Sequence, residues 1–393
     1  MYDAVVVGGG PAGSYAAYKL AGMGHDVIVL DKKEKLGEPV CCTGIISKEC
    51  VDSFAIDNSV ILNQVSNIKL FSSTGNLIRF SRQNTQACIV DRGALDKMLA
   101  ERAQNEGAKY VLNSPVSDMK IENNGVKVKI NRQEEELIVE ARVVVVAAGF
   151  GARLISGLGL GKINDFIMGA QATVETVGID ETEVYFSQER APGFFAWLVP
   201  ISPATALVGL ALHSSTSFYM RKLLASLLEE GKIASDKIKP CYRAIPLSPL
   251  SRTYGQRLVV VGDSAGQVKP TTGGGVYFGL LCADIAASNL HRALESGDLS
   301  AKSLSGYERE WKKLIGRELK ICYYARKFYE RLSDKQIDRI FNIIKSRDLE
   351  EVLFKDNDLP FDWHGEIILK LLGYKMLSGA IKAMKIPFRI RRD

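Results

Sequence analysis

This chain of 393 residues has few cysteines, few histidines and a small net charge, and each of these limits the classes of protein to which it can belong. Seven cysteines, an odd number spread thinly, argue against the disulfide framework of a small secreted protein. A net charge of +6 is too mild to indicate nucleic-acid binding. With 46% apolar and 24% charged residues, the chain has the composition of a folded globular protein of two domains, or of one large domain with insertions.

Patterns for export, membrane insertion and metal binding are also weak. Met1 stands almost directly before the first apolar run, which leaves no room for a signal peptide. Residues 194–212 carry no charge, but Pro200 and Pro203 would break a membrane helix, so two strands and a turn are expected there. No metal site is predicted, because the paired cysteines at 41 and 42 lack a second spaced pair or nearby histidines. The four histidines, at positions 25, 213, 291 and 364, look scattered.

Residues 1–31 carry the clearest functional pattern. An apolar run leads into Gly8-x-Gly10-x-x-Gly13, a helical pattern follows, and a second apolar run ends in Asp31. The first glycine allows a tight turn, the second lets backbone approach a pyrophosphate, and the third lets helix pack close to strand. This order predicts a dinucleotide whose phosphates meet the helix N-terminus and whose ribose hydroxyls donate to Asp31.

Residues 257–294 repeat this chemistry. A buried strand ends at Gly262-Asp263, and the turn Pro270-Thr271-Thr272-Gly273-Gly274-Gly275 precedes a long helix expected at 276–294. Asp263 can accept from sugar-alcohol hydroxyls of the cofactor, and the helix N-terminus would face a second negative charge, which is the N1/C2 carbonyl region of the reduced ring if the cofactor is a flavin. There is no second GxGxxG, so no separate nicotinamide domain is predicted.

The segments between these motifs read as a mixture of strands and helices. A hairpin is expected around Gly75-Asn76, a helix from Asp91-Arg92, and a buried parallel strand at 143–147, after short strands at 110–112, 116–121, 126–130 and 137–139. Arg92 either donates to the pyrophosphate or is a surface arginine. Alternating runs over 165–250, with one helix at 218–228, predict a β-rich substrate domain.

Residues 301–393 are expected to be largely helical. One buried stripe is predicted from Trp311, Leu314, Ile315, Ile321, Tyr324 and Phe328. The last helix, at about 367–384, is either packed with a solvated face or a basic amphipathic helix on an anionic membrane surface.

Cys41-Cys42 leaves two interpretations open. A zinc site needs two spaced pairs or histidines, and a redox disulfide is usually CxxC. Either one thiol is buried and the other incidental, or Cys42 lies near the reacting end of the cofactor.

Together these motifs resemble the p-hydroxybenzoate-hydroxylase-like FAD proteins, and among them the archaeal geranylgeranyl reductases, also called digeranylgeranylglycerophospholipid reductases. Residues 39–44 resemble that family's proline–cysteine–glycine loop near the flavin, and residues 270–275 its flavin-contacting turn. Residues 192–200 resemble its aromatic-x-Trp-x-Phe-Pro substrate motif. The chain departs from the family at Val199, where a second aromatic is usual, and at Thr43-Gly44, where other members have further glycine and acidic residues.

The resemblance implies an α/β (α+β) fold with three parts. A Rossmann-like FAD-binding domain of the glutathione-reductase type would comprise residues 1–64, 88–164 and 251–300. A β-rich substrate domain would comprise 65–87 and 165–250, and a helical C-terminal domain 301–393.

The resemblance also implies that reduced FAD supplies hydride from N5 to a prenyl C=C bond while a proton reaches the neighbouring carbon. The expected catalytic residues are Cys42, Gly274 and Gly275, with Cys42 or a water near Thr43 and residues 273–275 as the proton route. The expected substrate residues, for which plain core packing is the alternative, are Phe194, Phe195, Trp197 and Pro200. The expected FAD-binding residues are Gly8, Gly10, Pro11, Ala12, Gly13, Asp31, Lys32, Cys41, Cys42, Thr43, Gly44, Arg92, Val116, Ala148, Gly149, Gly262, Asp263, Pro270, Gly273, Gly274 and Gly275.

The implied substrate is a prenylated glycerolipid or geranylgeranyl diphosphate, and the implied electron donor is NAD(P)H or a ferredoxin-type protein. A cytoplasmic location is expected, with peripheral membrane association left open and no nucleic-acid partner. Two alternatives remain. One is an FAD-dependent monooxygenase or halogenase, although no WxWxIP-type motif is present. The other is a flavoprotein electron-transfer dehydrogenase, for example one that reduces a quinone.

Overall fold

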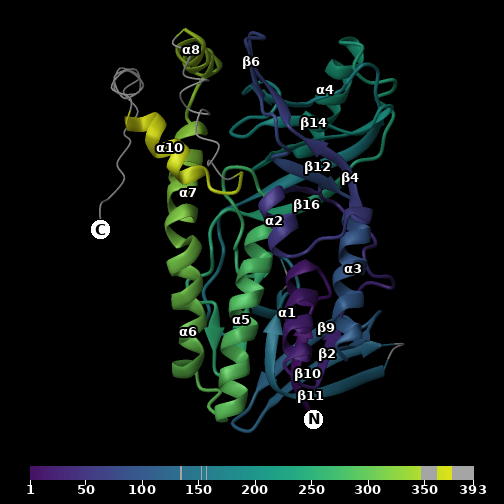
Figure 1. Cartoon of the computed structure of the whole chain (residues 1–393), viewed down its shortest axis with the longest axis vertical. Coiled ribbons are helices and arrows are strands. Elements are labelled where there is room, and N and C mark those ends of the chain that lie inside the picture. The colour runs from purple at the N-terminus through teal and green to yellow at the C-terminus, as the bar shows by residue number, and fades with distance from the viewer. Residues whose placement is uncertain (133–134, 152, 156, 347–360, 374–393) are drawn as a thin grey trace. The chain divides into compact units, whose positions relative to one another are not determined.

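The computed structural model describes residues 1–132, 135–151, 153–155, 157–346 and 361–373, and the chain divides into two compact units (Figure 1). Unit 1 comprises Met1–Val40, Asp91–Phe166 and Ile245–Leu319, and unit 2 comprises Cys41–Val90, Ile167–Ala244 and the residues from Lys320 onward. This differs from the expected three-part division. Residues 41–64 and 88–90 belong to unit 2, and the helical residues 301–319 belong to unit 1.

Unit 1 is built on the expected parallel sheet. The strand order is β17-β18-β11-β1-β2-β8, in which only β17 is antiparallel to its neighbour. The bounds are β1 Tyr2–Val7, β2 Val27–Leu30, β8 Lys109–Val111, β11 Glu135–Val146, β17 Tyr254–Gly255 and β18 Leu258–Val260. The central strands are apolar and buried, as expected for a sheet covered on both faces.

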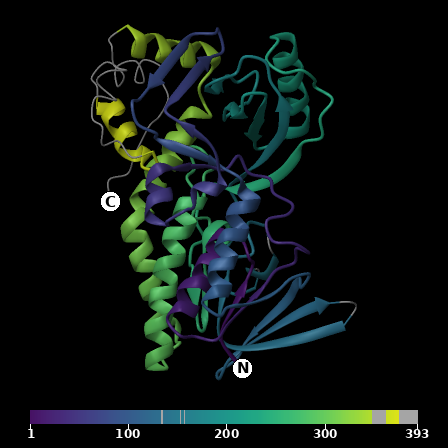
Figure 2. The same cartoon turned by 45° about the vertical axis from the view of Figure 1, so that its right-hand side comes forward.

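Strand β11 is longer than expected. The sequence predicted separate strands at 137–139 and 143–147, but the backbone stays extended throughout β11. Its first half pairs with the antiparallel strand β10 (Val126–Arg132), and its second half pairs with β1, so the partner changes near Ala141 without a break. β9 (Val116–Ile121) completes this antiparallel extension, which is prominent in Figure 2.

Four long helices complete unit 1: α1 (Pro11–Gly22), α3 (Arg92–Asn105), α5 (Val276–Ser296) and α6 (Ala301–Trp311). α1 packs against both α3 and α5, and α5 packs against α6. Short 3-10 turns lie at Arg153–Ile155 and Gly262–Ser264.

A π-helical turn, Lys312–Gly316, joins α6 to α7 (Arg317–Tyr329). Because of this turn, the buried stripe predicted for these helices is only partly correct. Trp311 and Ile315 are buried as expected, but Leu314 and Tyr324 are exposed. The wider turn resets the helical phase, because π-helical bonds span five residues. The buried positions therefore continue through Leu319, Cys322 and Arg326.

Unit 2 contains a seven-stranded sheet of order β16-β12-β15-β14-β13-β5-β6 and a three-stranded sheet of order β3-β7-β4. Its strands are β3 Ile45–Ser47, β4 Ile61–Val65, β5 Asn67–Ser72, β6 Leu77–Ser81, β7 Ala87–Val90, β12 Phe166–Glu175, β13 Thr182–Phe186, β14 Ala196–Ser202, β15 Thr205–Leu212 and β16 Cys241–Pro246. Its helices are α2 Lys48–Ser53, α4 Thr216–Glu229, α8 Asp334–Lys345 and α10 His364–Gly373, with a 3-10 turn at Asn58–Val60.

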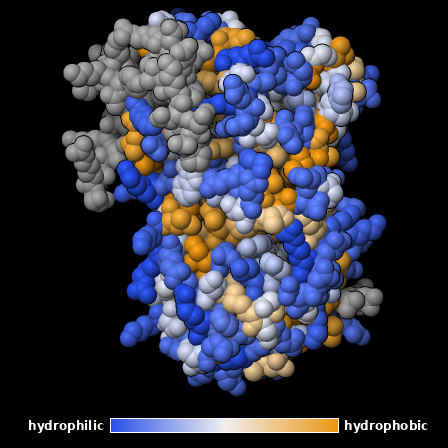
Figure 3. All heavy atoms as spheres, in the orientation of Figure 1, coloured by the Kyte–Doolittle hydropathy of each residue, from blue (hydrophilic) through white to orange (hydrophobic). Residues whose placement is uncertain are grey.

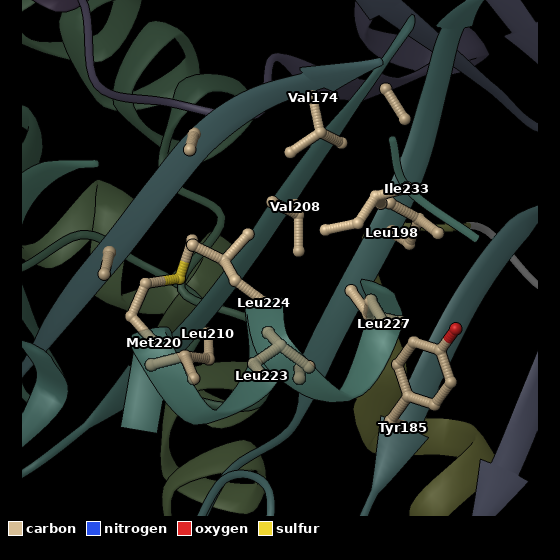
Figure 4. Close-up of a cluster of buried hydrophobic side chains, with 14 of the residues drawn as sticks. Val174, Tyr185, Leu198, Val208, Leu210, Met220, Leu223, Leu224, Leu227 and Ile233 are labelled. Atoms are coloured by element: carbon tan, nitrogen blue, oxygen red, sulfur yellow. The ribbon is translucent and has the colours of Figure 1, made fainter. Parts of the chain in front are cut away.

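The core of unit 2 lies between α4 and the larger sheet (Figure 4). Met220, Leu223 and Leu227 on α4 contact a layer of strand residues that includes Leu198 and Val208. Residues 165–250 contain the strands β12 to β16 and the helix α4, and their role as a substrate domain stays a prediction.

The uncharged segment 194–212 forms β14 and β15, which pair antiparallel as expected. Among the described helices, none has the length and apolarity needed to cross a bilayer. In the view of Figure 3, hydrophilic residues cover much of each unit and apolar residues gather in smaller groups. Most of the predicted basic C-terminal helix, from residue 374 onward, lies outside the described residues.

Candidate functional site

The glycine loop between β1 and α1 is closely packed on its protein side. Gly8 has φ +108, and a side chain there would overlap the carbonyl of Ala147 on the neighbouring strand connection. A methyl group at Gly13 would overlap the carbonyl oxygen of Gly8. These two glycines therefore let α1 start directly against the end of β1, as the sequence predicted.

Gly10 behaves differently, because a Cβ atom there would meet no protein atom within 4 Å. Gly10 is the N-cap of α1, Pro11 occupies the first helical position, and Ala12 follows. The cap has no side-chain hydrogen bond, so the helix N-terminus offers its backbone N–H groups to an anion. A loop closed on one side and open beside a helix N-terminus fits the predicted pyrophosphate.

Asp31 lies at the end of β2 and holds the glycine loop. Its side chain is 7% exposed, Gly9 N–H donates to Oδ2 at 2.6 Å, and Lys33 N–H donates to Oδ1 at 2.8 Å. The carboxylate thus fixes the loop, and contact of its remaining lone pairs with ribose hydroxyls stays a prediction. The next residue, Lys32, is exposed.

The predicted segment around Gly262-Asp263 lies beside the glycine loop that follows β1. A Cβ atom on Gly262 would sit 3.0 Å from Cβ of Ala12, and one on Gly279 of α5 would sit 3.6 Å from the same atom. Ser264 Oγ donates to the carbonyl of Gly149 at 3.0 Å, which ties Ala148-Gly149 to the start of this segment. The structure therefore brings together the loops after β1, β11 and β18, which are distant in sequence.

The turn before α5 places a carboxylate at the helix N-terminus. Asp263 Oδ1 would be 2.8 Å from a Cβ atom on Gly275, the N-cap of α5. The turn is closed by hydrogen bonds from Gly273 N–H to Lys269 O at 2.8 Å and from Lys269 N–H to Gly274 O at 3.0 Å. Pro270 within it is buried. Lys269 is only 4% exposed, and its motif gave no signal of a buried cation.

Two further predicted residues have structural partners. Arg92 is 8% exposed and its Nη2 lies 2.8 Å from Asp96 Oδ1, so the interpretation as a surface arginine is wrong. Asp91 caps α3 by accepting from Ala94 N–H at 3.0 Å. Val116 packs against the core of unit 1. Cofactor contact by Arg92 and Val116 stays a prediction.

In unit 2 the cysteine pair has a role that the sequence did not reveal. Cys41 forms a disulfide with Cys241, 200 positions away, with Cα atoms 5.8 Å apart. Cys42 is free and partly buried, so the interpretation of one buried and one incidental thiol is wrong. Thr43 Oγ1 donates to Gln171 Oε1 at 2.6 Å, and Gly44 O accepts from Val90 N–H at 2.9 Å, which fixes the loop.

The predicted substrate aromatics form a contiguous group in unit 2. Phe194 and Phe195 are stacked with centroids 4.3 Å apart, and Trp197 meets Phe195 edge-on at 5.9 Å. Phe194 is fully buried and lies under the Arg326 guanidinium at 4.3 Å, so it is a core residue. Phe195 and Trp197 are only partly buried.

The Trp197 environment is unusual for a strand residue. Its indole lies over Gly209 on β15, where any side chain would overlap the ring. Its buried Nε1–H has no hydrogen-bond partner among the residues that the structure describes. Pro200 is buried, and its carbonyl accepts from Asn63 Nδ2 at 2.9 Å.

Glycine loops at the ends of parallel strands, each followed by a long helix, are typical of a dinucleotide-binding protein. A family model described as lycopene cyclase protein matches residues 3–354. A digeranylgeranylglycerophospholipid reductase of Methanocaldococcus jannaschii is 31% identical over 355 residues, covering 86% of this chain and 90% of the relative. One from Methanothermobacter thermautotrophicus is 31% identical and covers 89% of this chain and 94% of the relative.

Solved structures agree with these relatives. A geranylgeranyl bacteriochlorophyll reductase-like protein of Thermoplasma acidophilum superposes with a TM-score of 0.85 at 26% identity, covering 98% of both chains. A p-nitrophenol 4-monooxygenase of Pseudomonas putida has a TM-score of 0.72 at 16% identity over 98% of both chains, which shows a shared fold. The chain belongs to the digeranylgeranylglycerophospholipid reductase family, within the wider family that the lycopene cyclase model describes. The predicted flavoprotein fold class is confirmed.

Proposed function

We propose that this chain is an FAD-dependent reductase that saturates the carbon–carbon double bonds of geranylgeranyl chains in membrane glycerolipids. The observation that carries the proposal is the arrangement of unit 1, where two glycine loops lie side by side and the first is open at Gly10. Family membership supplies the substrate class, because the relatives are named as reductases of geranylgeranyl glycerophospholipids.

Each loop has a distinct task in holding FAD, which in its reduced form supplies a hydride. The N-terminus of α1 and Gly10 receive the pyrophosphate, and Asp31 accepts from the ribose hydroxyls. Asp263 accepts from the sugar-alcohol hydroxyls of the flavin side. The N-terminus of α5, which begins after Gly275, would stabilise negative charge on the reduced ring through the helix dipole, whereas the N–H groups of Gly273 and Gly274 donate within the turn and would hold its shape.

Saturation of one double bond consumes a hydride and a proton, so two electrons must come from a donor in each cycle. We assign the proton to the Cys42 thiol or to a water that it orders. The disulfide holds Cys41 to β16, which leaves Cys42 as the free thiol of this loop. For the electrons the proposed donor is NAD(P)H or a ferredoxin-type protein.

The substrate chain is assigned to the exposed edge of the aromatic group in unit 2. The rings of Phe195 and Trp197 are only partly buried in the core, so part of their surface can contact a ligand. Aromatic rings suit this role because they bury a large apolar area at low entropy cost. We also assign the indole N–H of Trp197, which is buried and has no hydrogen-bond partner among the described residues, to a hydrogen bond with an acceptor on the bound lipid.

The test is anaerobic re-oxidation of the flavin by lipid. Purified holoprotein is reduced with dithionite, a geranylgeranyl glycerolipid is added, and the absorbance of oxidised flavin is followed. The proposal predicts recovery with the unsaturated lipid and none with the fully saturated lipid. Recovery only on admission of oxygen would refute the reductase assignment and favour the monooxygenase alternative.

A further inference from the structure

Two of the four histidines meet in unit 1 although 266 positions separate them. His25 lies between α1 and β2, and His291 lies in the C-terminal part of α5. His25 Nε2 is 2.9 Å from His291 Nδ1, and the rings meet edge-on with centroids 5.1 Å apart. The expectation that the histidines are scattered is wrong for this pair.

A carboxylate joins the pair. Glu295 follows His291 by one helical turn, and residues at i and i+4 share a helix face. One ligand atom from each of His25, His291 and Glu295 lies within 4.8 Å of the others. From this arrangement we propose that the three residues bind one divalent transition-metal ion, with Zn²⁺ as the representative ion.

The ring geometry is close to that of a tetrahedral zinc site. Two imidazole nitrogens bound to Zn²⁺ at about 2.0–2.1 Å stand roughly 3.3 Å apart. The present separation of 2.9 Å needs only a small opening of the two rings. Glu295 is exposed, so a water can reach the fourth position.

The surroundings favour a cation. Asp3 Oδ2 lies 4.0 Å from Nδ1 of His25, the ring nitrogen that faces away from His291, so its negative charge lies beside the site without a direct hydrogen bond to the ring. Arg142 opposes the cation, since its Nη1 pairs with Asp3 Oδ1 at 2.9 Å. The carboxylates of Asp3 and Glu295 carry two negative charges and the guanidinium of Arg142 carries one positive charge. The net charge of these groups is therefore negative when both imidazoles are neutral.

The location indicates a stabilising role. The glycine loops follow the carboxyl ends of β1 and β18, whereas His25 precedes β2 and therefore lies at the opposite end of the sheet. α5 runs from its N-cap at Gly275 toward His291, along the length of unit 1 (Figure 1). A metal here would fasten the end of α5 to the segment before β2, and this inference does not depend on the proposed function.

Metal content and calorimetry test this proposal. Untagged holoprotein is stripped with EDTA, dialysed and titrated with ZnCl₂. The expected result is one Zn²⁺ per chain, with an unfolding midpoint raised by roughly 5 °C at a hundredfold excess over the dissociation constant. X-ray absorption should show two imidazole nitrogens at about 2.0 Å. Absence of stoichiometric binding at micromolar zinc would overturn the proposal.

Variants locate the site. His25→Gln and His291→Gln should each weaken zinc binding at least tenfold, and Glu295→Gln should weaken it while leaving the fold intact, because Glu295 is exposed. His213→Gln, in unit 2, is the matched control and should bind like the wild type. If either histidine variant fails to fold, Glu295→Gln decides the question. Equal binding by Glu295→Gln and wild type would then refute the assigned ligand set.

Discussion

Substituting Gly10 and Gly13 separately distinguishes a cofactor-binding loop from a merely well-packed one. A methyl group at Gly10 meets no protein atom within 4 Å, and the φ of −79 suits alanine. Gly10→Ala should leave the apoprotein as stable as the wild type, or more stable by about 0.4–1 kcal/mol, because alanine restricts the unfolded chain. The same methyl group occupies the space through which the pyrophosphate approaches, so FAD affinity should fall at least tenfold.

Gly13→Ala should act through the fold. Its methyl group overlaps the Gly8 carbonyl and stands 3.0 Å from Cβ of Ala147, so α1 must move off β1. Overpacking of this kind costs about 1–3 kcal/mol, occasionally more, and both apoprotein stability and FAD binding should suffer. Urea unfolding of the apoproteins and FAD titration by flavin fluorescence measure the two quantities. Wild-type FAD affinity in Gly10→Ala would refute the assignment of the open side to the pyrophosphate.

Three further predictions concern single groups. Asp31→Asn should weaken FAD binding and destabilise the loop by about 1.5–3 kcal/mol, because one of the two backbone N–H donors keeps only a neutral acceptor and the other faces an amide NH2, which cannot accept; calorimetry should show both effects, and an unchanged midpoint would contradict them. Trp197→Phe should raise the KM for lipid and largely spare stability, whereas Trp197→Ala should cost up to about 3 kcal/mol, the lower end of the range for core aromatics, because Trp197 is only partly buried; equal lipid kinetics in Trp197→Phe and wild type would exclude a role for the indole N–H. Thiol titration of the denatured protein should find five cysteines without reductant and seven after reduction, and seven in both samples would disprove the Cys41–Cys241 disulfide.

The cofactor loops could be predicted because their constraints are local. Gly8, Gly13 and Asp31 occupy fixed offsets from two strands and a helix, and those offsets reflect the geometry of one strand–helix–strand unit. The second loop was found for the same reason, since Gly262-Asp263 follows a buried strand and Gly275 caps a helix.

Features that depend on contacts distant in sequence could not be predicted. Cys241 gives no sign of its partner, because the place of β16 beside β12 in its sheet is set by the fold and not by the local sequence. His25 and His291 meet only because α5 runs the length of unit 1 beside α1. A pattern search along the chain reports spacing, and neither of these pairs has a characteristic spacing.

The prediction of the buried stripe on α6 and α7 was partly wrong for a local reason. The prediction assumed one uninterrupted α-helical period, but the π turn after Trp311 inserts an extra residue and moves Leu314 to the surface. No glycine or proline within Lys312–Ile315 marks the irregularity, and Gly316 at its end gives only a weak hint.

The most direct test of the central claim is the mass of the lipid after one anaerobic turnover. Holoprotein carrying one equivalent of reduced flavin is mixed with a geranylgeranyl glycerolipid, and the extracted lipid is analysed by mass spectrometry. Prenyl reduction predicts the gain of one hydrogen pair per flavin re-oxidised, with further pairs as reductant is supplied. A lipid of unchanged mass beside a flavin that reduces and re-oxidises normally would contradict the assignment of this chain as a geranylgeranyl reductase.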